Sequence, residues 1–342
     1  MLSTMLSKNF SNLIFKSIGH GTINHLKPVK YKESTGDIRN IYDEIILDYV
    51  LGPPFVLHVS IPDLMAGAWS LVRETMIVNV NVDRLTKEKV AGGVSLSNQC
   101  PFCVEAHINM SGGRTEKNKN DIFEWSKSLY SPNSELIKNP PFSKEEAPEI
   151  IGTALAFSYI NRMVSVFVTD YPLPMPRLLG FLKPGLSSLF KLTAAKNITG
   201  INVETGVSLK RMPGAVLPNE FLWAKTNSNI SQCFSGFDAL STTTGEKYIS
   251  PDIQEPVLDY ISDWKGEDQG IGNQWIEKVI TNMSDDNKKI ASLILLVAFQ
   301  PYKVTKQQIV DLQNQGLKDD QLLAFVSWGS WQATKRISSW LC

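Results

Sequence analysis

Apolar residues recur at helical spacing along most of the chain, and this periodicity limits the possible folds more than any other feature of the sequence. One predicted helix opens at Pro62 and places Leu64, Ala68 and Leu71 on a single face. Similar spacing predicts further helices over residues 85–98, 147–167 and 319–341. Alternating β-branched runs between tight turns, which would predict strands, are sparse. The sequence therefore predicts an all-α fold.

The predicted helix over residues 85–98 carries an unusual pair of glycines. Gly92 and Gly93 each cost about 1 kcal/mol inside a helix, so we expect another backbone to approach this helix closely. Its expected buried face consists of Leu85, Val90, Val94 and Leu96.

Composition excludes several classes of function. The 342-residue chain is 43% hydrophobic, and its 34 lysines and arginines are balanced by 34 aspartates and glutamates, largely interspersed. Nucleic-acid binding normally needs a basic patch, so we expect no such partner. The apolar run Ala291–Phe299 is less than half of the ~20 residues that a membrane span needs, so no membrane partner is expected either.

The N-terminal segment has a lysine-rich, acid-free composition up to Glu33, which resembles a transit peptide. It has no arginine before Arg39 and lacks the apolar stretch and cleavage site of a secretory signal. We expect an ordinary helix here and a cytoplasmic protein, with a transit peptide as the alternative. The chain has four cysteines, and Cys233 and Cys342 stand alone, so a disulfide framework is not expected.

A proline-containing segment divides the chain into two predicted lobes. Residues 171–185 ("YPLPMPRLLGFLKPG") contain four prolines, and no helix runs through them unbroken. The predicted organisation is an N-terminal extension over residues 1–35, a first lobe over 36–170, a connection over 171–243 and a second lobe over 244–342.

A possible internal repeat relates the two lobes. Residues 87–107 align without a gap on residues 287–307, with a lysine, an apolar residue and an alanine in register. The second copy replaces the chemically reactive residues of the first by Lys288, Gln300, Lys303 and Gln307. We therefore expect an active first lobe and a degenerate second one, with chance similarity between amphipathic helices as the alternative.

The chemistry is concentrated in "NQCPFCVEAHINM", residues 98–110. A helix predicted to start at Asn98 as N-cap would place Cys100, Cys103 and His107 on one face. Cysteines in a first helical turn are expected to have lowered pKa values. His107 could take the proton of Cys103, and Glu88 on the preceding helix could orient the imidazole.

The spacing Glu88, eleven residues, Cys100, two residues, Cys103, three residues, His107 resembles the signature of the AhpD-like alkylhydroperoxidases, in the carboxymuconolactone decarboxylase superfamily. Segments 73–75, 87–91 and 157–164 are similar to longer, two-lobed members, so the resemblance covers residues 36–342. The founding alkylhydroperoxidase has a second histidine inside its CxxC, where this chain has Phe102.

The resemblance implies an AhpD-like helical fold and an oxidoreductase that reduces organic hydroperoxides. It implies that Cys103 attacks the peroxide and becomes a sulfenic acid, and that Cys100 resolves it as a disulfide. Glu88 and His107 would relay protons through a water. The implied partners are an organic hydroperoxide and an external dithiol reductant of the dihydrolipoyl type, with a homo-oligomer possible and no metal or bound cofactor.

Three alternatives stay open from the residues alone. Zinc binding would need a fourth ligand beside Cys100, Cys103 and His107, and no second CxxC supplies one. A non-catalytic helical interaction protein would retain a vestigial CxxC with a buried, unreactive Cys103. A carboxymuconolactone decarboxylase-like enzyme would have no need of paired cysteines. Separately, Arg162 lies in an apolar predicted helix, so we expect a carboxylate partner from the neighbouring lobe.

Overall fold

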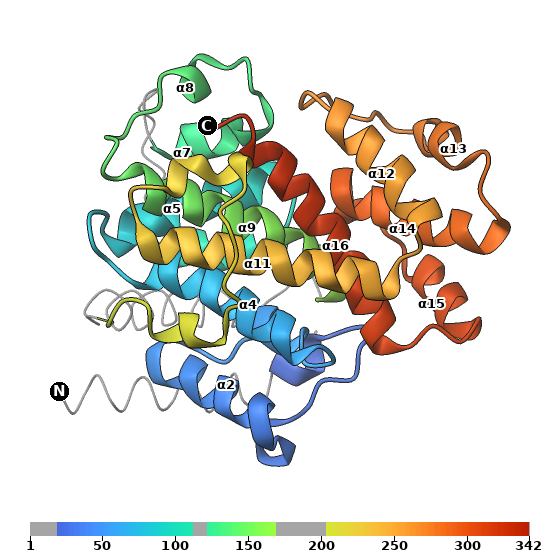
Figure 1. The fold of residues 1–342 in the computed structure, drawn as a ribbon, viewed down its shortest axis with the longest axis horizontal. Helices are drawn as coiled ribbons and strands as arrows, with labels where there is room; N and C mark the ends of the chain where they lie inside the picture. The colour runs from blue at the N-terminus through green and yellow to red at the C-terminus, as the bar shows by residue number, and fades with distance from the viewer. Residues whose placement is uncertain (1–18, 112–121, 169–202, 342) are drawn as a thin grey trace, which may run out of the picture.

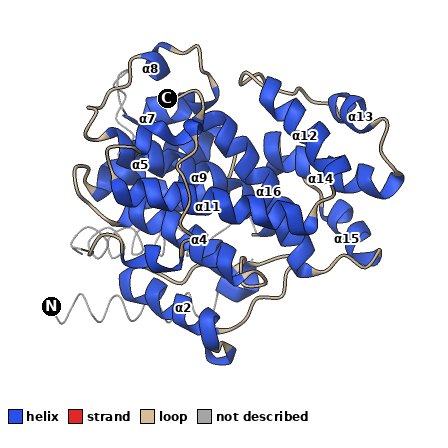
Figure 2. Ribbon diagram, in the orientation of Figure 1, coloured by secondary structure: helices blue, strands red, loops and turns tan. Residues whose placement is uncertain are grey.

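The computed structural model describes residues 19–111, 122–168 and 203–341, and these residues form helices joined by loops (Figures 1 and 2). The only strand-like pairing among them is an isolated bridge between Ile23 and Val168. The predicted all-α fold is confirmed.

The helices of the first half are α2 (Gly36–Asp48), α3 (Pro53–Val56), α4 (Pro62–Val72), the π-helix η3 (Arg73–Ile77), α5 (Arg84–Ser97), α6 (Pro101–Met110), α7 (Ile122–Lys127), α8 (Glu135–Lys138) and α9 (Ala147–Phe167). Those of the second half are α11 (Ser228–Tyr248), α12 (Pro251–Asp263), α13 (Gln274–Ile280), α14 (Asp285–Phe299), α15 (Lys306–Asn314) and α16 (Asp319–Ser338). Short 3-10 turns lie between them: η1 (Gly19–Thr22), η2 (Tyr31–Glu33), η4 (Ser128–Tyr130), η6 (Val207–Arg211), η7 (Asn219–Ala224) and η8 (Pro301–Lys303).

Four long helices fill the centre of the molecule. α9 packs against α4 and α16, and α11 packs against the same two helices (Figure 1). α5, α6 and α7 lie to one side of this centre, while α12 to α15 lie to the other. Buried residues from Leu26 to Ile337 form one continuous core, and a smaller apolar cluster joins α12, α13, α14 and α16.

Within the described part of the chain, one helix is long and apolar enough to cross a membrane by length and composition. It is α9 rather than the run Ala291–Phe299, and 94% of its most apolar window is buried inside the protein. Its neighbours are α5 and α16, so its apolar surface is covered by protein.

The first and second halves repeat one order of elements. α5 is followed by α6 and α9, and it packs against both; α14 is followed by α15 and α16, and it likewise packs against both. Pro101 and Pro301, aligned in the predicted repeat, begin α6 and η8. We propose on this basis that the two sets are related lobes.

The lobe boundaries are covered only in part. Residues 1–18 of the predicted extension and 169–202 around the predicted connection lie outside the described residues. The predicted boundary between residues 243 and 244 falls inside α11, whose residues Phe234 and Phe237 belong to the shared core. α11 packs against both α4 and α16, so this helix joins the two predicted lobes.

The buried face of α5 differs from the prediction. Val90 and Val94 are buried as expected, but Leu85 and Leu96 are 41% and 45% exposed. The inward positions are instead occupied by charged side chains, including Arg84 and Glu88. The spacing of apolar residues predicts the wrong buried face for α5, because this helix buries a cluster of charged side chains.

The expected close approach to the glycine pair is confirmed at Gly93. A Cβ there would clash with the Ser126 hydroxyl and lie 2.7 Å from the Phe123 carbonyl of α7. At Gly92 the nearest atom would be an ordinary 3.6 Å away. Gly93 is thus the residue that lets α7 pack on α5.

Candidate active site

A tight turn joins α5 to α6. The N–H of Cys100 donates to the Ser95 carbonyl and the N–H of Gln99 to the Leu96 carbonyl, each at 3.1 Å. This is the hydrogen-bond pattern of a Schellman motif, and Gln99 has the left-handed φ of 51° that the motif needs. The Cys100 carbonyl then accepts from the N–H of Val104 at 3.0 Å, so Cys100 both closes α5 and caps α6.

The predicted helix start at Asn98 is wrong. Asn98 ends α5, and α6 begins at Pro101. Proline lacks an N–H and disfavours the helical conformation in the residue before it, so α6 cannot extend back through Cys100. Cys103 nevertheless lies in the first turn and His107 one turn later, as expected.

Glu88 and His107 meet across this turn. Nδ1 of His107 lies 2.6 Å from Oε2 of Glu88, and both side chains are buried. The other carboxylate oxygen accepts from Nε of Arg84 at 2.8 Å. Burial alone would raise the pKa of Glu88, but the charges of Arg84 and His107 hold it below its usual value.

This geometry assigns the two nitrogens of the His107 ring. A carboxylate only accepts hydrogen bonds, so Nδ1 carries a proton and Nε2 is the nitrogen that can act as a base. The ring of Phe157 packs edge-on against the imidazole, with centroids 4.4 Å apart. Glu88 and Phe157 together fix the orientation of the base.

Cys100 and Cys103 are not joined in a disulfide, and only 1% and 2% of their surface is exposed. Burial raises the pKa of the Cys103 thiol well above its usual value, and the neighbouring Cys100 raises it further. The lowered pKa expected at a helix start is therefore wrong, because desolvation outweighs the helix terminus. A hydrogen bond with the side chain of Asn161 acts in the opposite direction and lowers the pKa of Cys103.

Buried amide groups link α5 and α9 behind the thiol. Nδ2 of Asn98 donates to Oδ1 of Asn161 at 3.0 Å, and Nδ2 of Asn161 donates to Oγ of Ser95 at 3.1 Å. The hydroxyl of Tyr130 donates to Oδ1 of Asn98. Asn98 therefore serves this network instead of capping a helix.

Arg162 continues the network towards the second lobe. Its Nη1 donates to the Tyr130 hydroxyl at 3.3 Å and to the Ser158 carbonyl at 2.7 Å, and its Nε donates to the Ala298 carbonyl at 3.0 Å. The expected carboxylate partner is not found among the described residues. The buried guanidinium is held by neutral oxygens, one of them at the C-terminal end of α14, where the helix dipole is negative.

Tyr49 lies on the other side of the cluster. Its hydroxyl donates to Sδ of Met110 at 3.7 Å, and its ring centroid is 5.2 Å from the Arg84 guanidinium. Burial, with smaller contributions from the charges of Glu88 and Cys103, raises the pKa of Tyr49 to about 12. Tyr49 is thus a neutral hydroxyl beside the thiol, at a position that the sequence analysis did not single out.

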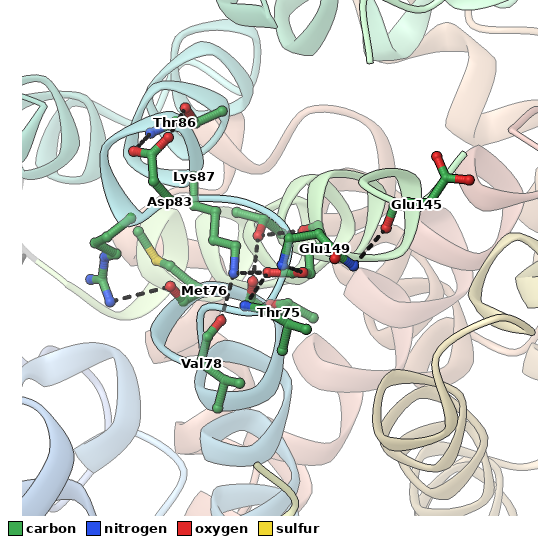
Figure 3. Close-up of polar contacts among 12 residues, drawn as sticks. Thr75, Met76, Val78, Asp83, Thr86, Lys87, Glu145 and Glu149 are labelled. Carbon is green, nitrogen blue, oxygen red and sulfur yellow. Dashed lines mark hydrogen bonds and ion pairs between the residues drawn. The ribbon is translucent and has the colours of Figure 1, made fainter. Parts of the chain in front are cut away.

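A buried ion pair fixes the start of α5. Lys87 and Glu149 point toward one another between α5 and α9 (Figure 3). Lys87 also donates to the Val78 carbonyl at 2.5 Å, and Glu149 accepts from the N–H of Asn81 at 2.6 Å. Burial lowers the pKa of Lys87, while the charge of Glu149 opposes this shift. The pair holds the loop before α5 and thereby the helix that carries Glu88.

The aligned positions of the second half make structural bonds instead. Nε2 of Gln300 and Nζ of Lys303 both donate to the Gly270 carbonyl, at 2.8 and 2.6 Å. Gln307 bonds to Asp311 of its own helix. Among the described residues, no group of three or more histidine, cysteine or acidic side chains converges as a metal site.

A helical fold that brings a CxxC pair, a histidine and a glutamate together at one turn resembles the AhpD-like alkylhydroperoxidases. No family model matches the chain. It is 25% identical over 335 residues to the alkyl hydroperoxide reductase Rv2159c of Mycobacterium tuberculosis, covering 93% of this chain and 95% of that protein. Similarity to a protein named alkyl hydroperoxide reductase thus covers nearly the whole length of the chain.

Proposed function

We propose that this protein is a thiol-dependent peroxidase that reduces organic hydroperoxides through a dithiol–disulfide cycle of Cys100 and Cys103. The observation that carries the proposal is the 2.6 Å contact between Glu88 and His107, formed at the turn that holds both cysteines. The similarity to an alkyl hydroperoxide reductase supports the same class of reaction.

The first step oxidises Cys103. Nε2 of His107, directly or through a water, takes the thiol proton as the hydroperoxide arrives, and the thiolate attacks the terminal peroxide oxygen. The O–O bond breaks, Cys103 becomes a sulfenic acid, and the alkoxide leaves as an alcohol with the proton that His107 returns. Glu88 stabilises the imidazolium between these two transfers. A buried thiol with a raised pKa needs such a base.

The second step forms the disulfide. The sulfur of Cys100 attacks Sγ of the Cys103 sulfenic acid, and the hydroxyl leaves as water. An external dithiol of the dihydrolipoyl type then reduces the Cys100–Cys103 disulfide by thiol–disulfide exchange. This cycle requires no metal or bound organic cofactor.

A second candidate is a non-catalytic helical protein with a vestigial CxxC. The burial of Cys103 and its raised pKa favour this candidate, because thiolate formation is costly in such surroundings. Reactivity with peroxide separates the two.

The deciding experiment is an anaerobic titration of the reduced protein with cumene hydroperoxide, counting the thiols lost. The peroxidase proposal expects one equivalent to consume two thiols per chain, Cys100 and Cys103. Cys233 is fully buried and burial raises its pKa, so it should persist. Loss of one thiol or of all four contradicts the dithiol cycle, and no loss supports the vestigial site.

A further inference from the structure

The amide network behind Cys103 has one direction along its whole length. Arg162 donates to the hydroxyl of Tyr130, and that hydroxyl donates to the Asn98 carbonyl oxygen. The amide nitrogen of Asn98 donates in turn to Oδ1 of Asn161. Each group accepts from the Arg162 side and donates towards the thiol, an arrangement in which successive hydrogen bonds polarise one another.

The side-chain amide of Asn161, the last in the network, has a hydrogen-bond acceptor for each of its two hydrogens. One N–H of Asn161 is taken by Oγ of Ser95 at 3.1 Å, and its carbonyl oxygen is taken by Asn98. The other N–H is left for the Cys103 sulfur, with which the Asn161 side chain is hydrogen-bonded. Since Asn161 is fully buried, no water competes for this contact.

The network begins on a fixed positive charge. Arg162 stays protonated at any ordinary pH. It is held by neutral oxygens, and no carboxylate among the described residues forms an ion pair with it. A chain of donors that starts on such a charge favours a negative charge at its other end.

We propose that Asn161 is a positioning residue that stabilises the Cys103 thiolate as the final donor of a hydrogen-bond chain beginning on Arg162. The inference rests on the proposed function, because it supplies the thiolate that the peroxidase reaction uses. It also gives the second lobe a part in that chemistry, since the Ala298 carbonyl at the end of α14 holds the first member of the chain.

The test measures the pH at which the Cys103 thiol becomes reactive. In the Cys100→Ser background, alkylation of Cys103 by iodoacetamide is followed across pH by peptide mass mapping. The other titratable groups around Cys103 stay unchanged in every variant compared: Arg84, Glu88, His107 and Tyr49. Asn161→Leu should move the alkylation midpoint upward by about one to two pH units, because a hydrogen bond to a charged group is lost. At a fixed pH below the midpoint, this is a loss of about ten- to a hundredfold in rate.

Tyr130→Phe is a second variant that tests the same hydrogen-bond chain if Asn161→Leu fails to fold. It keeps the ring but removes the hydroxyl that links Arg162 to Asn98, so the midpoint should move upward by less. Ser95→Ala is the matched control, because it removes the other bond of the same amide and leaves the chain intact. Its midpoint should equal that of the background protein.

An unchanged or lowered midpoint in Tyr130→Phe and in any folded Asn161→Leu protein overturns the chain. A shift in Ser95→Ala as large as in Asn161→Leu also overturns it, because general loosening would then explain both. The outcome is independent of the proposed reaction. Wild-type protein that consumes no cumene hydroperoxide ends the peroxidase proposal and leaves the alkylation result standing.

Discussion

Nδ1 of His107 and Oε2 of Glu88 lie 2.6 Å apart, although the two residues belong to different helices and are separated by the turn that carries Cys100. Burial keeps water from weakening this contact.

Glu88→Gln keeps the shape of the side chain and removes its charge. The imidazolium–thiolate pair then loses its stabilising anion, so the thiolate forms at higher pH and the pH profile of the peroxide reaction should move upward. Stopped-flow measurement of peroxide consumption across pH checks this. A profile that coincides with the wild type would remove Glu88 from the mechanism.

Cys103→Ser and Cys100→Ser should fail in different ways. His107 follows Cys103 by one helical turn and is the proposed base for this thiol, so Cys103→Ser should abolish peroxide consumption. Cys100→Ser should react once per chain and stop as a sulfenic acid at Cys103, which dimedone traps and mass spectrometry locates. A dimedone adduct on Cys100 in the Cys103→Ser protein would reverse the two roles.

Arg84→Met should change how stability depends on pH. The folded-state pKa of Glu88 is lowered from the ordinary 4.5, so wild-type Glu88 stabilises the fold above that pH and loses this contribution as pH falls. Without Arg84, burial raises the pKa of Glu88 and the neutral-pH contribution disappears. We expect a loss of about 3–5 kcal/mol at pH 7, the usual cost of breaking a buried pair.

Urea denaturation at pH 7 and pH 4 measures this loss for wild type and Arg84→Met. The gap between the two proteins should narrow at the lower pH. Arg84→Lys is the matched control, since it keeps the charge and should recover part of the stability. Curves that stay parallel across pH would contradict the assigned role of Arg84.

Gly93→Ala should destabilise the protein, while Gly92→Ala should not. The added methyl at Gly93 meets the backbone of α7 at 2.7 Å, and overpacking of this kind costs about 1–3 kcal/mol. At Gly92 the nearest atom lies 3.6 Å away, so the better helix propensity of alanine should give a neutral or stabilising change of up to about 1 kcal/mol. Chemical denaturation of both variants tests the pair, and equal effects would argue against the α5–α7 contact.

The helical fold could be predicted because apolar spacing in α4, α9 and α16 follows packing directly. The same reasoning failed on α5, where Leu85 and Leu96 are exposed. There the buried face belongs to charged side chains: Arg84 pairs with Glu88 on the same helix, and Lys87 pairs with Glu149, far along the chain. A periodicity of apolar residues carries no signal for a buried face made of paired charges.

The site was predictable where its residues are close in sequence. Cys100, Cys103 and His107 share one helix start, and Glu88 precedes them by one helix. Arg84 could have been found from its i, i+4 spacing to Glu88. Asn161, Tyr130 and Tyr49 could not, because only tertiary packing brings them to the thiol, and neutral amides and hydroxyls leave no spacing pattern.

The contact between Arg162 and Ala298 has a consequence for how the protein is made. The ribosome releases the CxxC turn long before it has synthesised α14, so the nascent first lobe has a guanidinium whose carbonyl partner does not yet exist. Until that later helix docks, the donor chain to Cys103 lacks its anchor. A truncated or stalled chain could contain both cysteines and yet lack this anchor. The electrostatic environment of its Cys103 sulfur would then differ from that in the finished molecule.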